Sequence, residues 1–456
     1  MQSSTIGKYR WTICALLFFA TTINYLDRQV LSLLKPSLEV EFGWKDSDYA
    51  NIAATFQFIY AIALLFAGRV IDKLGTKRGY TWAIVLWSVG AIVHAVSIPI
   101  GGAIGKILSV IGITGVGASV AGFMFSRAVL AVGEAGNFPA AIKATAEYFP
   151  KKERSFATGI FNSGANVGAV LAPVSVPWIA AAWGWGAAFI IIGGIGFVWL
   201  IFWWLMYERP EKQKRLSAEE YAYINSDSDN EQAAADEAAP PAKVSWTKLL
   251  AYRQTWAFTF GKFMTDGVWW FFLFWLPAYL KDQHGMTPLS MSMPLAILYT
   301  ITGVGSVTGG WFPMYFIKKG YTPYDGRMRA MLVIALIPLV VLLAQPFGDA
   351  NYWIPVVLIG IGTAAHQAWS ANIFTTVSDM FPKKAIGSVV GIGGFAGGMG
   401  GVLMTKLGGA LFDHYKAVDH IKTGYTIMFT ICALAYLVAW IVMKTLVPKY
   451  RPISDL

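Results

Sequence analysis

Six ionisable residues lie inside stretches of sequence that are otherwise apolar. They are Asp27, Arg28, Arg127, Glu134, Lys262 and Asp266. An ionisable side chain costs roughly 2.5–3.5 kcal/mol at the centre of a bilayer, so it is by default a functional candidate there. Three of the six are acids and three are bases, so a cavity lined by all of them is neutral when every group is ionised.

This balance predicts how such a cavity would carry an anion. An anion that enters alone leaves one negative charge to cross a low-dielectric region. Its inward movement opposes an inside-negative potential at about 2.3 kcal/mol per 100 mV. One proton bound by a carboxylate cancels that charge. The six residues therefore favour proton–anion symport, provided that they share one cavity.

Spacing along the chain separates their roles. Arg127 and Glu134 are seven residues apart, so they share a helix face but lie roughly 10 Å apart along its axis. We expect Arg127 to pair with Asp27, which leaves Glu134 near the midplane without a partner. Asp27 and Glu134 are then the predicted proton sites, and Arg127 is the basic residue that we assign to proton coupling with them. The alternative is that Asp27 and Arg127 form a static interhelical ion pair.

The other charged residues suit an anionic substrate. Arg28 follows Asp27 and points about 100° away from it on a helix. A planar guanidinium suits bidentate capture of a carboxylate, so we predict that Arg28 binds the substrate. Lys262 and Asp266 are four residues apart and can touch. They are either a structural pair, or Lys262 is a second partner for a carboxylate or hydroxyl.

Uncharged polar side chains in the same stretches could bind the hydroxyls of a polyol. Any of them can instead be satisfied by neighbouring backbone, and a lone buried histidine is often structural. The candidates are Asn24, Tyr60, Asn162, Asn166, Tyr299, His366, Gln367 and Asn372. From these we predict substrate-binding roles for Tyr60, Asn162, His366, Gln367 and Asn372.

The sequence offers no sign of catalysis. The five histidines lack metal-ligand spacing, both cysteines lie in apolar runs, and there is no phosphate loop. We therefore expect no catalytic residues, no metal and no cofactor, and we do not expect an enzyme.

Composition places these residues in a membrane protein. Of 456 residues, 56% are hydrophobic and 14% are charged, and the mean hydropathy is +0.52. This excludes a soluble fold, because a water-facing surface needs more ionisable side chains. The net charge of +10 is explained by basic cytoplasmic loops, so we expect lipid contact and no nucleic-acid partner.

Twelve apolar segments are long enough to span a bilayer. They lie near 10–34, 49–69, 80–99, 118–146, 155–178, 186–207, 255–280, 291–317, 328–346, 352–378, 385–411 and 424–446. With both termini inside, 25 of the 36 Lys and Arg fall in cytoplasmic segments and seven in external loops. We therefore predict a multi-pass protein with both termini in the cytoplasm.

An internal repeat divides the spans into two sets. Residues 147–152 (EYFPKK) recur 232 positions later as 379–384 (DMFPKK), and glycines downstream of them also match. Under the same offset His366 aligns with Glu134. We predict an all-α membrane protein with two pseudo-symmetric six-helix bundles, at 1–207 and 255–456, and with a substrate site between them.

The segment 208–254 is predicted to be a cytoplasmic linker. Ser217 and Glu220 have capping-box spacing and could open a short helix. Residues 226–243 are polar, acidic and proline-terminated, and we expect them to be disordered.

Several motifs resemble known transporters. Residues 68–78 (GRVIDKLGTKR) resemble the signature loop of the major facilitator superfamily, although Thr76 stands where a basic residue is usual. Three further motifs, at 24–28 (NYLDR), 133–139 (GEAGNFP) and 148–154 (YFPKKER), resemble the anion:cation symporter family. Lys262 and Asp266 with Trp269-Trp270, together with residues 365–367 (AHQ), look most like bacterial hexuronate transporters.

This resemblance implies roles for individual residues. It implies gating by the signature loop through Asp72 and Arg78, proton binding at Asp27 and Glu134, and substrate contacts at Tyr60 and Lys262. Residues 391–395 (GIGGF) depart from the sugar-acid pattern because they offer no side-chain amide.

The resemblance, taken together with the charge balance, implies a monomeric carrier in a bacterial inner membrane. It would import a hexuronate such as glucuronate or galacturonate together with a proton. The alternatives are a carrier for an aldonate, an aldarate or another organic anion, and a non-transporting sensor built on the same fold.

Overall fold

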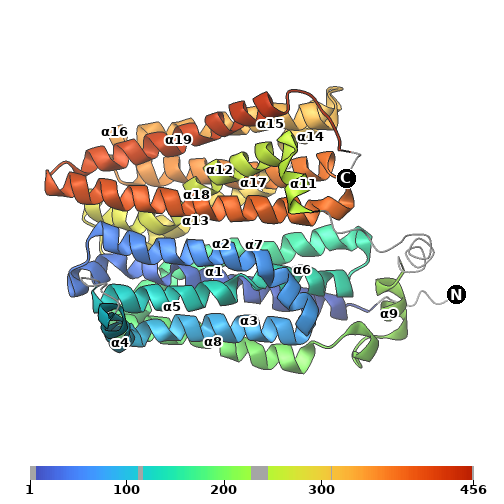
Figure 1. Ribbon diagram of the computed structural model, residues 1–456, viewed down its shortest axis with the longest axis horizontal. Coiled ribbons are helices and arrows are strands. Elements are labelled where there is room, and N and C mark those ends of the chain that lie inside the picture. The colour runs from blue at the N-terminus through green and yellow to red at the C-terminus, as the bar shows by residue number, and fades with distance from the viewer. Residues whose placement is uncertain (1–6, 111–116, 227–244, 310, 454–456) are drawn as a thin grey trace.

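The computed structural model describes residues 7–110, 117–226, 245–309 and 311–453. Every regular element in these ranges is a helix, as predicted (Figure 1). The first half of the chain forms α1 (Tyr9–Phe42), α2 (Asp46–Leu74), α3 (Thr76–Val93), η1 (His94–Val96), α4 (Ser97–Val110), α5 (Ala118–Glu134), α6 (Asn137–Tyr148), α7 (Lys151–Trp183) and α8 (Trp185–Met206).

The second half repeats this plan after a connecting segment that lies between Met206 and Arg253. The connection contains η2 (Pro210–Lys212), α9 (Ala218–Ile224) and α11 (Trp246–Leu250). The helices of the second half are α12 (Arg253–His284), α13 (Ser292–Thr308), α14 (Trp311–Lys318), α15 (Pro323–Leu336), η3 (Ile337–Leu343), α16 (Ala344–Gly348), α17 (Trp353–Met380), α18 (Lys383–Ala417) and α19 (Ile421–Leu446).

Nine helical segments within the described ranges are long and apolar enough to cross a membrane. Helices α1, α12 and α17 have comparable lengths of 34, 32 and 28 residues, which is consistent with twelve spans. Several helices extend beyond the predicted bounds. At 1.5 Å per residue α1 is about 51 Å long and overshoots a hydrocarbon core of about 30 Å.

The sequence repeat has a direct structural counterpart. Pro150 and Pro382 are the N-caps of α7 and α18, with φ/ψ of −62°/154° and −64°/150°. The preceding residues, Phe149 and Phe381, are extended and end α6 and α17. A proline disfavours the helical conformation in the residue before it, so the same motif ends one helix and starts the next in both halves.

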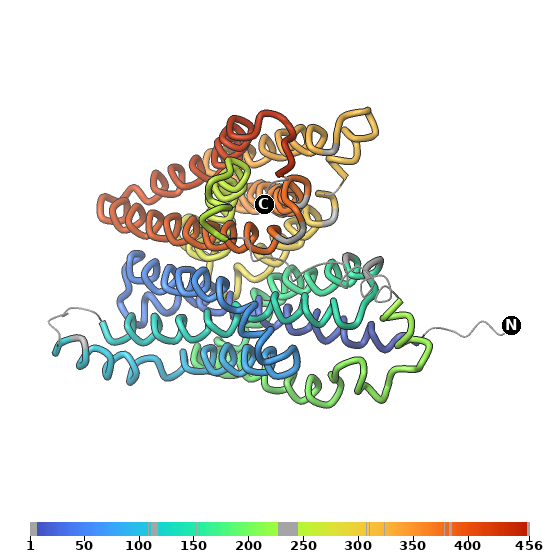
Figure 2. The backbone as a smooth tube through the Cα atoms, turned by 45° about the vertical axis from the view of Figure 1, so that its right-hand side comes forward, coloured from blue at the N-terminus to red at the C-terminus, as the bar shows by residue number. Residues whose placement is uncertain are grey.

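The two halves of the chain form two bundles lying side by side (Figure 2). Helix α2 packs along α18, α7 along α13, and α1 along α12. Both chain termini lie at one end of the molecule, on the right in Figure 1, which we call the terminal end. The opposite end, where α1 ends and α2 begins, is the far end.

The bundles touch at the far end and separate toward the terminal end. Along α18, a Cβ on Gly409 would meet Ala50, and one on Gly398 would meet Ala61, both on α2. Further toward the terminal end, Gly394, Gly391 and Gly387 have no described heavy atom within 4 Å of that position. The two bundles are therefore in contact from the far end to about the middle of the molecule, and they are apart from there to the terminal end.

The part of the connecting segment around α9 is fixed to the first bundle, whereas α11 contacts α12 and α18 of the second bundle. Helix α9 starts where predicted, and the Ser217 hydroxyl accepts the Glu220 amide at 3.1 Å. The Glu220 carboxylate does not complete a capping box. It accepts the backbone amides of Tyr9 and Arg10 at 3.1 and 3.0 Å instead, and so caps α1. Apart from Ser226, the segment predicted to be disordered lies outside the described residues.

Candidate functional site

The main buried charge cluster lies where α1, α2 and α5 meet. Helix α5 ends at Glu134, and the turn at Ala135 and Gly136 separates it from α6. Gly133 allows α5 to lie directly against α3, because a Cβ there would be 2.2 Å from the amide nitrogen of Trp87. This close packing fixes the end of α5 against α3.

Arg28 of α1 and Glu134 of α5 form a buried ion pair. The Nη2 and Nε atoms of Arg28 lie 2.6 and 2.8 Å from Oε2 of Glu134. Arg28 also donates to Oδ1 of Asn24 at 3.3 Å. The expectation that Glu134 has no ionic partner is therefore wrong. Its second oxygen, Oε1, has no hydrogen-bond partner in the part of the chain that the structure describes.

The expected ion pair between Asp27 and Arg127 does not form. Arg127 donates through Nη2 to the backbone carbonyl of Arg28 at 3.2 Å. Both carboxylate oxygens of Asp27, and the Nε and Nη1 atoms of Arg127, lack hydrogen-bond partners among the described residues. The side chain of Arg28, which points about 100° away from Asp27 on α1, takes Glu134 as its partner, and Arg127 bonds to the backbone of α1 instead. All four charged side chains of this cluster are buried.

Aromatic rings surround the Arg28 guanidinium. Its carbon Cζ lies 4.7 Å from the ring centre of Tyr25, 5.0 Å from Tyr60, 5.3 Å from Trp270 and 5.4 Å from Phe56. Such rings attract a cation through their quadrupoles. Trp270 belongs to α12, so the second bundle completes this aromatic cage. Sequence reasoning missed Tyr25 and Phe56, although Tyr25 lies one helical turn before Arg28.

A second pair lies on α12. The Nζ atom of Lys262 is 2.6 and 2.8 Å from the two carboxylate oxygens of Asp266, as their spacing allowed. Lys262 also lies over the ring of Phe374 at 4.4 Å. A Cβ on Gly397 of α18 would be 2.3 Å from Asp266, so this glycine makes room for the carboxylate.

The two clusters adjoin each other. Trp270, in the cage around Arg28, lies one helical turn beyond Asp266 on the same helix. The charged residues of the two ion pairs, Arg28 with Glu134 and Lys262 with Asp266, therefore lie around the contact between the bundles.

The predicted polar contacts have different environments. His366 bonds through Nδ1 to the hydroxyl of Tyr436 at 2.9 Å and stacks on Trp269 with ring centres 5.3 Å apart. Asn372 donates to the carbonyls of Gly309 and Ala368 at 2.9 and 2.8 Å, so backbone satisfies its amide. Asn162 is exposed, and Gln367 is half-buried.

The predicted gating residues lie at the terminal end. Asp72 pairs with Lys143 of α6 at 2.8 Å, within its own bundle. Arg78 is exposed. Thr76, which departs from the signature, donates to Glu147 at 2.6 Å.

Sequence reasoning also missed a charged network that joins the bundles at the far end. Lys281 of α12 pairs with Glu39 of α1, and Lys416 of α18 pairs with Asp46 of α2 at 2.9 Å. The carboxylate of Asp413 accepts the backbone amides of Asp46 and Ser47 at 2.7 and 3.0 Å. A residue of the second bundle thus caps a helix of the first.

Comparison with known proteins agrees with this architecture. The family model described as Major Facilitator Superfamily matches residues 17–405. The chain has the same fold as the crystal structure of a D-xylose-proton symporter. That comparison has a TM-score of 0.72 at 14% identity and covers 98% of this chain and 100% of that one.

Three relatives illustrate its sequence neighbourhood. The hexuronate transporter of Escherichia coli (strain K12) is 29% identical over 444 residues, covering 96% of this chain and 95% of that protein. The galacturonate transporter of Dickeya chrysanthemi is 32% identical over 313 residues, covering 69% and 84%. The D-galactonate transporter of Escherichia coli O6:H1 is 27% identical over 415 residues, covering 90% of each.

Proposed function

The chain belongs to the Major Facilitator Superfamily, a family of transporters, and we propose that it is a proton-coupled carrier that imports a hexuronate, glucuronate or galacturonate, by alternating access. The observation that carries this proposal is the ion pair between Arg28 and Glu134, buried beside the contact between the bundles. The similarity to hexuronate and galacturonate transporters supports the substrate class.

The ion pair links proton binding to anion binding. While Glu134 is ionised, it occupies the guanidinium of Arg28. A proton bound at Glu134 removes that competitor and leaves a planar, bidentate donor for the carboxylate of a sugar acid. The free Oε1 of Glu134 is the oxygen available to this proton.

Asp27 is the second proposed proton site. An ionised carboxylate that is buried without hydrogen bonds is very costly, whereas a neutral acid costs much less. Asp27 is buried and has no hydrogen-bond partner among the described residues, which supports a role in proton exchange. Arg127, which is buried in the same cluster, supplies a fixed positive charge to the proposed route.

The second bundle supplies the proposed contacts to the sugar ring and its hydroxyls. Lys262, His366 and Gln367 lie there, and Asn162 lies on α7, which faces α13 across the interface. Tyr60 contributes its ring to the cage around Arg28. Asn372 is the weakest of the predicted contacts because its amide already binds backbone.

We propose that the protein is a monomer in a bacterial inner membrane. It is oriented with both termini in the cytoplasm. The units are the bundle 1–207, the linker 208–254 and the bundle 255–456. With this orientation, the terminal end faces the cytoplasm. The separation of the bundles there corresponds to an inward-open carrier, in which Asp72 and Arg78 are gating residues away from the other bundle.

Counterflow in proteoliposomes tests this proposal. Purified protein is loaded with unlabelled galacturonate or glucuronate, and entry of the labelled sugar acid is followed with and without a pH gradient. We expect exchange in both conditions and accumulation only with the gradient. Failure with every sugar acid, in protein that is folded by circular dichroism, would refute the substrate class and favour a sensor.

A carrier for an aldonate is the second candidate. The similarity to the D-galactonate transporter of Escherichia coli O6:H1 supports it. Competition in the same assay separates the two, because an aldonate carrier exchanges galactonate in preference to galacturonate.

A further inference from the structure

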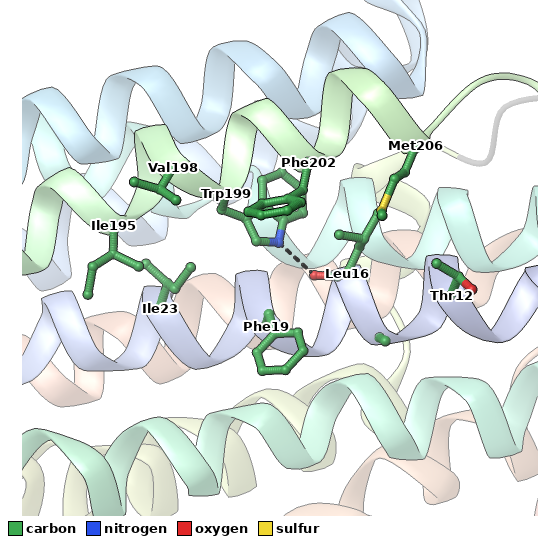
Figure 3. Close-up of a pocket in the computed structure, with 10 residues that line it drawn as sticks. Thr12, Leu16, Phe19, Ile23, Ile195, Val198, Trp199, Phe202 and Met206 are labelled. Atoms are coloured by element: carbon green, nitrogen blue, oxygen red, sulfur yellow. Dashed lines mark hydrogen bonds between the residues drawn. The ribbon is translucent and has the colours of Figure 1, made fainter.

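An apolar groove runs along the outer face of the first bundle, between α1 and α8 (Figure 3). Its volume is about 400 Å³, and Leu16, Phe19, Ile23, Ile195, Phe202 and Met206 are among the residues that line it. The indole of Trp199 donates to the carbonyl of Leu16 at 3.0 Å and joins the two helices beneath the groove. The groove is distinct from the charged clusters at the interface.

The length of the groove matches one leaflet of a bilayer. Its lining on α1 extends from Thr12 to Ile23, which corresponds to about 16 Å at 1.5 Å per residue. The hydrocarbon core is about 30 Å thick, so the groove covers about half of it. Thr12 and Met206 lie at the terminal end of the groove (Figure 3). An extended acyl chain from that leaflet fits these dimensions.

Polar groups begin where the apolar lining ends. The hydroxyl of Tyr9 donates to the carbonyl of Met206 at 2.6 Å, and Nη1 of Arg215 donates to the same hydroxyl at 3.3 Å. Gln213 also donates to the carbonyl of Met206, at 2.8 Å. Arg215 is therefore held at the mouth of the groove while remaining exposed.

The two chain segments that meet at the mouth, residues 7–10 and 206–219, carry exposed charges that are positive on balance. The exposed basic residues of these segments are Lys8, Arg209, Lys212, Lys214 and Arg215, and the exposed acidic residues are Glu211 and Glu219. Glu220 is nearby but buried, where it caps α1 and pairs with Arg10 at 3.2 Å. An apolar channel one leaflet long that ends in a basic cluster complements an anionic lipid.

We propose that this groove binds an anionic phospholipid from the leaflet at the terminal end. One acyl chain lies between α1 and α8, and Arg215 and Lys8 hold the phosphate headgroup. The bound chain fills the space between the two helices on the side away from the interface. This site is independent of the substrate proposal and does not require that the carrier bind a sugar acid.

Native mass spectrometry of the purified full chain tests the site. The protein is titrated with phosphatidylglycerol and, separately, with phosphatidylcholine of the same acyl chains. We expect phosphatidylglycerol to bind more tightly. In the double variant Lys8→Gln/Arg215→Gln we expect that preference to fall by about fivefold for each basic side chain removed.

Two further variants separate the headgroup from the acyl chain. Ala15→Trp places a large side chain in the groove and should weaken both lipids. Lys318→Gln/Lys319→Gln removes two exposed charges at the C-terminal end of α14 in the second bundle and should change the binding of neither lipid. Circular dichroism and gel filtration verify that each variant is folded.

Three outcomes would overturn the proposal. One is equal binding of both lipids by the unaltered chain. Another is an unchanged lipid preference in Lys8→Gln/Arg215→Gln, which tests the headgroup contact even if Ala15→Trp does not fold. The third is a dimer that Ala15→Trp dissociates, because a second copy of the chain would then occupy the groove.

Discussion

The guanidinium of Arg28 lies 2.6 Å from the carboxylate of Glu134, although the two residues are 106 positions apart in the sequence. Both side chains are almost fully removed from solvent. A cation and an anion that satisfy each other in this way must separate if either is to bind something else. The pair is therefore suited to a switch in which a proton and a carboxylate bind together.

Replacement of Arg28 tests the substrate side of this switch. We expect Arg28→Ala to lose both exchange and pH-driven accumulation, because it removes the proposed donor for the substrate carboxylate. Truncation of one partner in a buried charge pair costs about 2–5 kcal/mol, so affinity should fall at least about thirtyfold. Ligand binding by isothermal titration measures this, with circular dichroism as the check on folding. Unchanged affinity would remove Arg28 from the site.

The cage around Arg28 predicts an effect of Trp270. Its ring centre lies 5.3 Å from the guanidinium carbon and comes from the opposite bundle. A cation–π contact contributes about 0.5–2 kcal/mol, so Trp270→Leu should raise KM about two- to thirtyfold. Trp178→Leu alters a tryptophan that is 67% exposed and serves as the matched control. Equal effects of the two changes would show that the cage plays no specific part.

A double-mutant cycle separates the two roles of the Lys262 and Asp266 pair. If Lys262 binds substrate, Lys262→Gln should raise KM about tenfold or more, and adding Asp266→Asn should not restore it. If the pair is purely structural, the double variant should recover, because removal of both partners of an ion pair is often nearly neutral. Uptake kinetics of the single and double variants distinguish these results. We expect no recovery.

The cap that Asp413 provides to α2 predicts a conformational effect. Asp413→Ala leaves the amides of Asp46 and Ser47 without their partner only while the bundles are closed at the far end. Loss of an N-cap costs about 0.5–2 kcal/mol, so the open population at that end should rise about two- to thirtyfold. Labelling of cysteines introduced at the far end measures that population.

The matched control for this effect is Asp349→Ala. Asp349 pairs with Lys422 at the far end, but both residues belong to the second bundle. Its removal should leave the labelling rate unchanged. Faster labelling in Asp349→Ala than in Asp413→Ala would contradict a specific role for the cap between bundles.

Periodicity and repeats in the sequence predicted much of the fold. The apolar runs predicted the long helices, and the proline motifs at 147–152 and 379–384 end and start helices in both halves. Ser217 predicted the start of α9 correctly. These features depend on interactions between residues that are close along the chain.

The pairing of the buried charges depends on geometry that the sequence does not specify. Asp27 and Arg28 are consecutive, so a rotation of α1 by about 100° decides which of them meets α5. The prediction paired Asp27 with Arg127, whereas the structure turns Arg28 toward Glu134. The far-end network is harder still to predict, because Asp413 and Asp46 are 367 residues apart and meet only when both bundles have formed.

The most direct test of proton coupling is sugar-acid transport by Glu134→Gln in proteoliposomes. Glutamine keeps the shape of the side chain but has no carboxyl group to ionise, so it cannot take up and release a proton during the transport cycle. We predict that this variant retains counterflow of labelled galacturonate and fails to accumulate it when a pH gradient is imposed. Normal accumulation under the gradient, with the same protein content and orientation in the vesicles, would contradict the assignment of Glu134 as the coupling site.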